Sequence, residues 1–373
     1  MVQIILVLHA YQPPYPVQET WIVDKVVGNC YRPVITKLLE SNAKLVANFN
    51  ASLLENLATQ APDLVSSINR AVTDGKLELL GSGAYHPIFP LIDDHWGQRQ
   101  IELNYEINSN IFSEYNPVGF WPPELAVNKE TLSLIKRTGH IYSIVPQTSV
   151  NSICKIGLPE GELVLVPRDK DLSNVISFKG VKTVEELLSK VEKKYGENPC
   201  VLAMDMETFG EHNAHYEEFL FDFLNDPRVH TLTFSDIDFS DLQPTPEFID
   251  SSWSTDLYHL REGVPYPLWN HPANALHALI LDHMDIVEKY VESVVQDLDD
   301  QDFKVLEIVF LKSQHSCQLW WADGEQGRWS PSMVRKGLDL QRRVLANASN
   351  ILKEISGKII ARVNRVIEFR SSD

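Results

Sequence analysis

The sequence predicts an α/β fold with a parallel sheet, followed by a helical C-terminal region. Up to about Pro244, apolar runs of strand length alternate with amphipathic helical patterns, which is typical of parallel strands joined by helices. About seven or eight such strand–helix units favour a closed or nearly closed barrel over an open sheet. Beyond Pro244 the long periodic patterns are all helical.

The expected strands are short runs rich in Val, Ile and Leu, as in strands buried on both faces. They lie at residues 2–8, 44–48, 77–81, 118–121, 141–145, 163–166, 201–204 and 230–233. Amphipathic patterns predict helices between them at residues 31–41, 53–73, 96–112, 129–138, 183–195 and 215–224. The segment 53–73 is expected to form two helices, because Pro62 interrupts the pattern and removes a backbone donor.

The C-terminal third predicts long helices at residues 273–297, 301–319 and 331–355. The first of them carries an apolar stripe at helical spacing, formed by Leu276, Leu279, Ile280, Met284, Ile286 and Val287. The preceding stretch, 235–261, is rich in Ser, Asp, Pro and Thr and reads as loop. We therefore expect a (β/α)-type barrel over residues 1–260 and a helical subdomain over 261–373 that packs on it.

Charge and cysteine usage narrow the class of protein. The formal charge is −18, from 33 basic and 51 acidic residues, which disfavours nucleic acid and anionic membranes as partners. The four cysteines are scattered and form no Cys-x-x-Cys pair, which favours a reducing compartment. The apolar start at residues 2–8 lacks a basic flank and a cleavage site, so it predicts a strand and not a signal peptide. We expect a cytoplasmic protein.

Two acid-bearing motifs stand where buried strands are expected to end. Glu124 closes the motif Gly-Phe-Trp-Pro-Pro-Glu, and Asp205 and Glu207 stand in Asp-Met-Glu. Desolvating such acids costs free energy unless they have partners or a function. If Asp205 and Glu207 lie on one face of an extended strand, their like charges raise the pKa of at least one of them. The plainer alternatives are a helix N-terminal acid at Glu124 and a solvated acidic loop at Asp205.

Several polar and aromatic residues are further candidates for binding a substrate. His9 and Gln12 follow the first strand, and His86 follows a Gly-Ser-Gly turn after the third; all three suit hydrogen bonds to sugar hydroxyls. Several of the eight tryptophans lie in expected loops, where an exposed ring stacks on a sugar, although core packing is the commoner role of a tryptophan. The tryptophans expected to bind substrate are Trp121, Trp269 and Trp320.

Taken together and in this order, these motifs resemble glycoside hydrolase family 57, which includes α-amylases, 4-α-glucanotransferases, α-glucan branching enzymes and amylopullulanases. The resemblance covers roughly residues 1–330. It implies an incomplete (β/α)7 barrel followed by a helical domain, and retaining chemistry without a metal or other cofactor. By motif, Glu124 matches the family's nucleophile and Asp205 its general acid/base.

The remaining motif positions carry over in the same way. His9, Gln12 and His86 match substrate-subsite positions, and Glu207 matches an acid that supports Asp205. Two positions depart from the family pattern: Tyr11 stands where many members have a second histidine, and Cys317 stands where an acid is expected.

The predicted function is a retaining glycoside hydrolase or transglycosylase that acts on α-glucans, with an oligo- or polysaccharide as its partner. Retention requires the two carboxyl groups to lie about 5–5.5 Å apart. One alternative is a metal-dependent deacetylase or mannosidase-like enzyme with His9, His86, Asp205 and His212 as ligands. Another is a carbohydrate-binding relative without turnover. The sequence does not choose between hydrolysis, transfer and branching, and it leaves linkage, chain length and oligomeric state open.

Overall fold

The computed structural model describes residues 1–178, 180–245, 247–325 and 327–372. Parallel strands form two sheets, β3-β2-β1-β8 and β4-β5-β7-β6, in which β6 alone runs antiparallel. A bridge between Gly81 and Phe120 joins β3 to β4, and the Asp169 N–H donates to the Val201 carbonyl, 2.8 Å away, between β7 and β8. The parallel strands of the barrel are β1 (Val2–Ala10), β2 (Leu45–Phe49), β3 (Leu77–Leu79), β4 (Gly119–Phe120), β5 (Tyr142–Val145), β7 (Gly161–Pro167) and β8 (Pro199–Asp205).

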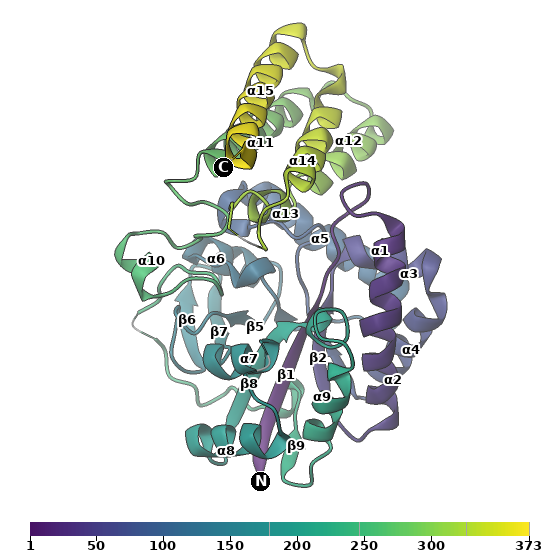
Figure 1. Ribbon diagram of the computed structural model, residues 1–373, viewed down its shortest axis with the longest axis vertical. Helices are drawn as coiled ribbons and strands as arrows, with labels where there is room; N and C mark the ends of the chain where they lie inside the picture. Colours follow the sequence, from purple (N-terminus) through teal and green to yellow (C-terminus); the bar gives the residue numbers. More distant parts are fainter. Residues whose placement is uncertain (179, 246, 326, 373) are drawn as a thin grey trace.

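This arrangement confirms the predicted fold, an incomplete (β/α)7 barrel followed by helices. The expected strand at 230–233 is β9 (Val229–Thr231), which among the described residues pairs with the first residues of β1 alone and does not extend the barrel. Helices surround the strands (Figure 1). They are α1 (Thr20–Val26), α2 (Arg32–Glu40), α3 (Ala51–Gln60), α4 (Pro62–Thr73), α5 (Asp94–Ile111), α6 (Lys129–Arg137), α7 (Lys170–Ser177), α8 (Val184–Tyr195) and α9 (Tyr216–Leu224).

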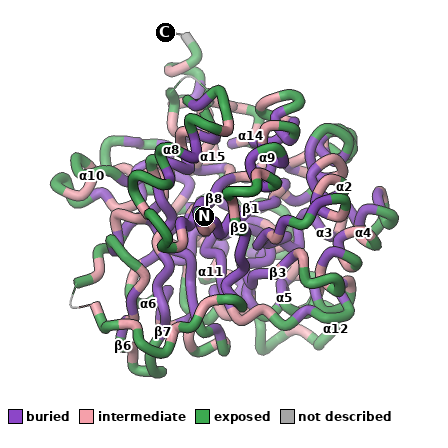
Figure 2. The backbone as a smooth tube through the Cα atoms, turned by 90° about the horizontal axis from the view of Figure 1, so that it is seen from below, coloured by how far each residue is buried: buried purple, intermediate pink, exposed green. Residues whose placement is uncertain are grey.

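The core has an inner and an outer layer because side chains alternate along each strand. On β1, Ile5 and Val7 join the cluster inside the barrel, which includes Trp121. Leu6 and Leu8, on the other face, pack against the surrounding helices. Burial on both faces explains the unbroken apolar runs of the sequence, and Figure 2 shows the strands buried at the centre with exposed residues on the outer helices.

The C-terminal helices lie at the end of the barrel opposite the N-terminus (Figure 1). They are α11 (Ala275–Val294), α12 (Asp300–Ser313), α13 (Cys317–Trp320), α14 (Pro331–Val344) and α15 (Asn350–Ser372), preceded by the short α10 (Leu257–Arg261). Since β1 starts at the N-terminus, this end carries the C-terminal ends of the parallel strands. The helical region therefore covers the edge where barrel active sites form. The boundary at residue 260 stays a prediction.

Several expected elements differ from those observed. The pattern at 301–319 breaks after Ser313, because the chain turns there to bring Ser316 against His86. The pattern at 331–355 breaks after Val344, and the Ser349 hydroxyl accepts the Leu352 N–H where α15 begins. The sequence analysis also missed α1, α7 and β6 (Cys154–Leu158). Within the described ranges, no helix combines the length and apolarity needed to cross a bilayer.

Candidate active site

Glu124 lies just after β4, in a turn with an unusual backbone conformation. Pro122 and Pro123 restrict the chain, and Glu124 and Leu125 then adopt left-handed backbone angles, with φ of 58° and 47°. Such a conformation costs about 1–3 kcal/mol in a residue other than glycine. The Trp253 N–H donates to the Glu124 carbonyl at 3.1 Å and holds the turn. The conformation is therefore maintained by a loop that lies far away in sequence.

The Glu124 side chain is nearly buried, with 13% of its surface exposed. Burial, and then the charge of Asp205, raises the pKa of Glu124 to about 8, against a hydrogen bond with the Trp253 side chain that lowers it. Glu124 and Asp205 therefore interact electrostatically, although they belong to different strands of the barrel. His86 is also a neighbour of Glu124, with its Nδ1 atom 3.9 Å from the Glu124 carboxylate.

Asp205 is the last residue of β8 and lies beside His9 in the register of the parallel strands. The chain then leaves the extended conformation for a 3-10 turn at Met206–Thr208, so the expected shared strand face for Asp205 and Glu207 is wrong. The raised pKa is nevertheless confirmed: burial and the charge of Asp205 raise the pKa of Glu207 to about 8.

Glu207 is buried and held by polar side chains near Asp205. Its Oε1 atom accepts a hydrogen bond from Gln12 Nε2 at 3.0 Å and another from the Tyr31 hydroxyl. Gln12 is itself held by Gln18, whose Nε2 donates to Gln12 Oε1 at 2.8 Å. Gln12, expected to contact substrate, is buried and bound to Glu207 instead. In this structure Gln12 therefore orients an acid that lies beside Asp205.

Two buried histidines lie near the acids, His9 beside Asp205 and His86 near Glu124. His9 Nε2 and His86 Nε2 share a hydrogen bond of 2.9 Å, while His9 Nδ1 faces Asn48 Oδ1 at 2.9 Å. His86 Nδ1 lies 2.8 Å from the Ser316 hydroxyl, which comes from the helical region. Burial lowers the pKa of both histidines, so they are neutral hydrogen-bonding groups at neutral pH.

The three expected substrate-binding tryptophans occupy different environments. Trp121 is fully buried and stacks under His9, with 5.1 Å between ring centroids. Trp269 is fully buried in the core of the helical region. Neither presents a face to a sugar ring, and this corrects the expectation for both. Trp320 is half-buried and lines a cavity of about 450 Å³ together with Asp205.

The same cavity is also lined by residues that were not predicted from the sequence to belong to the site. Arg168, which follows β7, and Trp253 both line it beside Asp205. The guanidinium carbon of Arg168 lies 5.4 Å from the Trp253 ring centroid. Trp253 is one of the eight tryptophans of the chain and stands in no recognisable motif. Arg168 is a single basic residue that follows a strand. The position of Arg168 at a strand end was the one usable signal.

The two departures from the family pattern lie against each other. The Tyr11 hydroxyl and Cys317 Sγ are 3.4 Å apart. The Tyr11 ring also stacks on His86, with 3.9 Å between centroids. Burial raises the pKa of both groups, and the charge of Glu124 raises both further. The contact between them raises the pKa of Tyr11, whereas its hydrogen bond lowers the pKa of Cys317. An uncharged pair therefore forms one wall near Glu124.

The residues of the metal-site alternative do not form a ligand set in this structure. His9 and His86 use ring nitrogens for the bond between them. Across the described ranges, no group of three or more His, Cys, Asp or Glu side chains is arranged to hold a metal ion.

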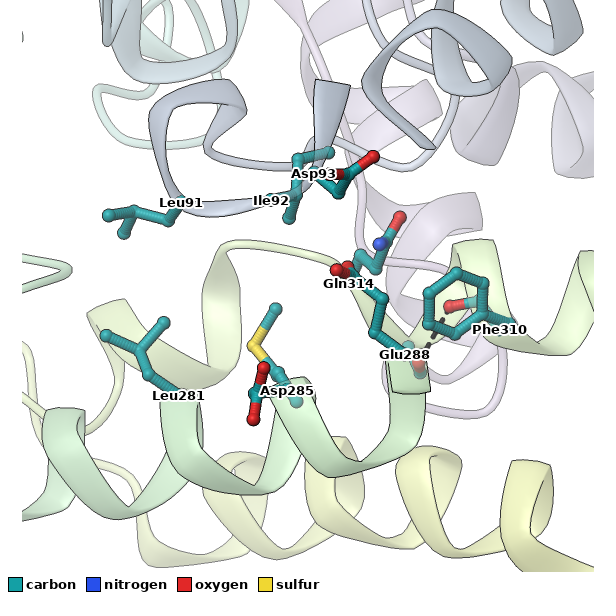
Figure 3. Close-up of a pocket in the computed structure, with 10 residues that line it drawn as sticks. Leu91, Ile92, Asp93, Leu281, Asp285, Glu288, Phe310 and Gln314 are labelled. Carbon is teal, nitrogen blue, oxygen red and sulfur yellow. Dashed lines mark hydrogen bonds between the residues drawn. The ribbon is translucent and has the colours of Figure 1, made fainter. Parts of the chain in front are cut away.

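A second cavity, of about 210 Å³, lies between the barrel and the helical region (Figure 3). Glu288 on α11 and Asp93, which caps α5, lie on facing walls of it. Burial, followed by the charges of Asp93 and Glu292, raises the pKa of Glu288 to about 7. This cavity shares no lining residue with the one that contains Asp205.

Comparison with known families places these motifs in a family. The sequence profile of glycosyl hydrolase family 57 matches residues 5–241, which is more than half of the chain. The chain belongs to glycosyl hydrolase family 57. The resemblance drawn from the sequence is thereby confirmed.

Relatives within this family are distant. The chain is 25% identical to a 4-alpha-glucanotransferase of Thermococcus kodakarensis over 63% of its own length and 39% of the relative's. It is 24% identical to an alpha-amylase of Pyrococcus horikoshii over 58% of its length and 37% of the relative's. The matched region thus spans about two fifths of these curated relatives.

Solved structures show the same fold. The 4-alpha-glucanotransferase from Thermococcus litoralis matches with a TM-score of 0.76 at 17% identity, over 93% of this chain and 60% of that one. A family 57 branching enzyme from Pyrococcus horikoshii matches with a TM-score of 0.72 at 15% identity, over 97% and 94% of the two chains. At these identities the likeness establishes the fold and not the reaction.

Proposed function

We propose that this chain is a retaining glycoside hydrolase or transglycosylase that acts on α-1,4-linked glucose polymers or oligosaccharides. One observation carries the proposal: Glu124 and Asp205 come from the ends of separate strands, and the charge of Asp205 raises the pKa of Glu124. Paired carboxyls at the C-terminal edge of a barrel are what retaining glycoside chemistry needs. Relatives named as glucanotransferases and amylases support a glucan substrate. The cytoplasmic location stays a prediction.

In this mechanism Asp205 protonates the glycosidic oxygen while Glu124 attacks the anomeric carbon. The bond to the leaving sugar breaks and a covalent glycosyl–Glu124 ester forms. Asp205, now ionised, takes a proton from water or from a sugar hydroxyl, which then attacks the ester carbon and releases Glu124. Water gives hydrolysis and a sugar hydroxyl gives transfer.

The reaction needs one proton on the carboxyl pair, located on Asp205. With the pKa of Glu124 at about 8, the empty site retains a proton at neutral pH. Positive charge that develops at the anomeric carbon favours the ionised form of Glu124, which faces it. Substrate binding therefore shifts the proton toward Asp205, where the leaving oxygen accepts it.

The test is a product assay with amylose and maltoheptaose. Wild-type protein is expected to yield a ladder of products, and Glu124→Gln and Asp205→Asn to lose about 1,000-fold or more in turnover because each removes an essential carboxyl. Glu185→Gln, which alters an exposed acid paired with Arg228, serves as the matched control and is expected to keep wild-type turnover.

Three results would contradict the proposal. Wild-type turnover in Glu124→Gln would remove the assigned nucleophile. Tight binding of maltoheptaose without products would favour a carbohydrate-binding role. Stoichiometric zinc in purified protein, with deacetylation of an acetylated polysaccharide, would favour the metal-dependent alternative.

A further inference from the structure

Arg168 is fixed at the catalytic edge of the barrel by the strands on either side. It directly follows β7, and its N–H donates to the Val145 carbonyl on β5 at 3.0 Å. The next residue, Asp169, bonds to Val201 on β8 and caps α7 by accepting the Leu172 N–H at 2.9 Å. The sheet and the start of a helix therefore set the direction of the Arg168 side chain.

The guanidinium is buried yet has few partners. Arg168 is 6% exposed, and its Nη2 donates one hydrogen bond, to Asn174 Oδ1 at 2.7 Å. Its Nε atom is buried without a partner among the described residues. Burial lowers the pKa of Arg168 only to about 10, so it is a cation at neutral pH. A guanidinium offers five N–H donors, and burying a charge with most of them unused is costly.

The surroundings indicate what the missing partner is. Arg168 lines the cavity of about 450 Å³ that contains Asp205, Trp253 and Trp320. Its guanidinium lies over Trp253, which also hydrogen-bonds the Glu124 side chain. Arg168 therefore shares a cavity with Asp205, while Trp253 contacts both Arg168 and Glu124.

Roles in the proposed reaction follow from these positions. The group next to the acid/base is the glycosidic oxygen, so the cavity beside Asp205 holds the sugar that departs or the acceptor that replaces it. Sugar hydroxyl oxygens accept hydrogen bonds from a guanidinium. An anionic ligand is disfavoured, because Glu124, Asp205 and Glu207 lie close by.

We propose that Arg168, seated on Trp253, binds the leaving sugar and the acceptor sugar beside Asp205. The inference rests on the proposed function and adds a substrate-binding residue on the leaving-group side. It predicts that loss of Arg168 lowers kcat/KM more for substrates whose leaving group is a sugar than for substrates with another leaving group.

The experiment compares two substrates with the same maltosyl group, maltotriose and α-maltosyl fluoride. Fluoride carries no hydroxyls and departs without a proton, so it needs neither Arg168 nor the acid. Arg168→Gln is expected to lower kcat/KM about 100-fold on maltotriose and less than about tenfold on the fluoride. The fluoride also reports whether the variant is folded.

Two further variants complete the experiment. Arg168→Lys keeps a cation with three N–H donors for sugar hydroxyls, although not the planar group that stacks on Trp253, and is expected to recover at least about tenfold of the loss on maltotriose. Arg228→Gln, an exposed arginine bound to Asp226 near the opposite edge of the barrel, is expected to match wild type on both substrates.

Equal losses on both substrates would overturn the inference, because they would indicate a structural role. Undiminished activity of Arg168→Gln on maltotriose, or no recovery in Arg168→Lys, would overturn it as well. If wild-type protein turns over neither substrate, the proposed function itself fails and the inference fails with it.

Discussion

At the scale of single residues, the site concentrates features that cost stability. Glu124 combines a left-handed backbone with a buried carboxyl, and Glu207 is buried a few residues beyond Asp205. Both carboxyls have pKa values near 8 because water is excluded and Asp205 is close. Strained and desolvated acids of this kind cluster at functional sites. The raised pKa of Glu124 fits the proposed reaction, in which the carboxyl pair holds one proton near neutral pH.

The raised pKa of Glu124 predicts the basic limb of the pH–rate profile. Up to about pH 8 Glu124 retains a proton, and above that pH Glu124 is ionised, so the site no longer holds the proton that the leaving oxygen needs. We expect kcat/KM on maltoheptaose to fall about tenfold per pH unit above pH 8. With α-maltosyl fluoride, which needs no acid, the basic limb is expected to be much weaker. Identical basic limbs for the two substrates would contradict this assignment.

The sequence predicted the positions of Glu124 and Asp205 near strand ends, which the structure shows, while their catalytic roles stay a proposal. Glu124 and Asp205 were identified because each follows an apolar run, which marks a strand end. Trp269 was misjudged because a tryptophan in a core and one in a binding site have the same local sequence. Arg168 carries no motif, and its burial and its contact with Trp253 depend on a loop about 85 residues later.

At the scale of elements, the sequence patterns gave the strands and the regular helices. Helix α7 was not predicted although Asp169 is a standard capping residue, because a helix of eight residues is too short to show a clear apolar period. The break before α15 was missed for a similar reason, since Ser349 caps a helix within a continuous helical pattern. Tertiary contacts decide such breaks: the turn after Ser313 places Ser316 against His86.

The junction between the barrel and the helical region makes its own prediction. The folded-state pKa of Glu288 is raised to about 7, whereas an unfolded glutamate titrates near 4.3. Between these values the folded state binds more protons, so stability falls as pH rises, and the loss is complete above about pH 7. Glu288→Gln cannot ionise and still offers an acceptor to the Asp93 N–H.

We therefore expect the Tm of Glu288→Gln to equal that of wild type near pH 5 and to exceed it by about 1–2 °C at pH 8. The figure is small because Glu288 is only partly buried. Glu354→Gln, an exposed acid paired with Lys358 on α15, is the control and is expected to show no such trend. A Tm difference that is flat with pH would show that Glu288 titrates normally.

At the scale of the whole molecule, the parallel barrel explains how distant residues meet. His9, Glu124, Arg168 and Asp205 each stand at or just past the C-terminal end of a strand, and all such ends share one edge. The sequence predicted this edge from strand–helix alternation. It did not predict that Ser316 contacts His86 or that Cys317 contacts Tyr11, because no local pattern encodes the packing of the helical region on the barrel.

The central claim is that Glu124 attacks the sugar while Asp205 acts as acid and base. The most direct test is to trap the glycosyl–enzyme with 5-fluoro-α-glucosyl fluoride and to map the labelled peptide by mass spectrometry. We predict one added glycosyl group per chain, on Glu124, and a trapped ester that persists longer in Asp205→Ala because the base is absent. A label on Asp205, or turnover of maltoheptaose by an enzyme that never acquires a label, would contradict the account.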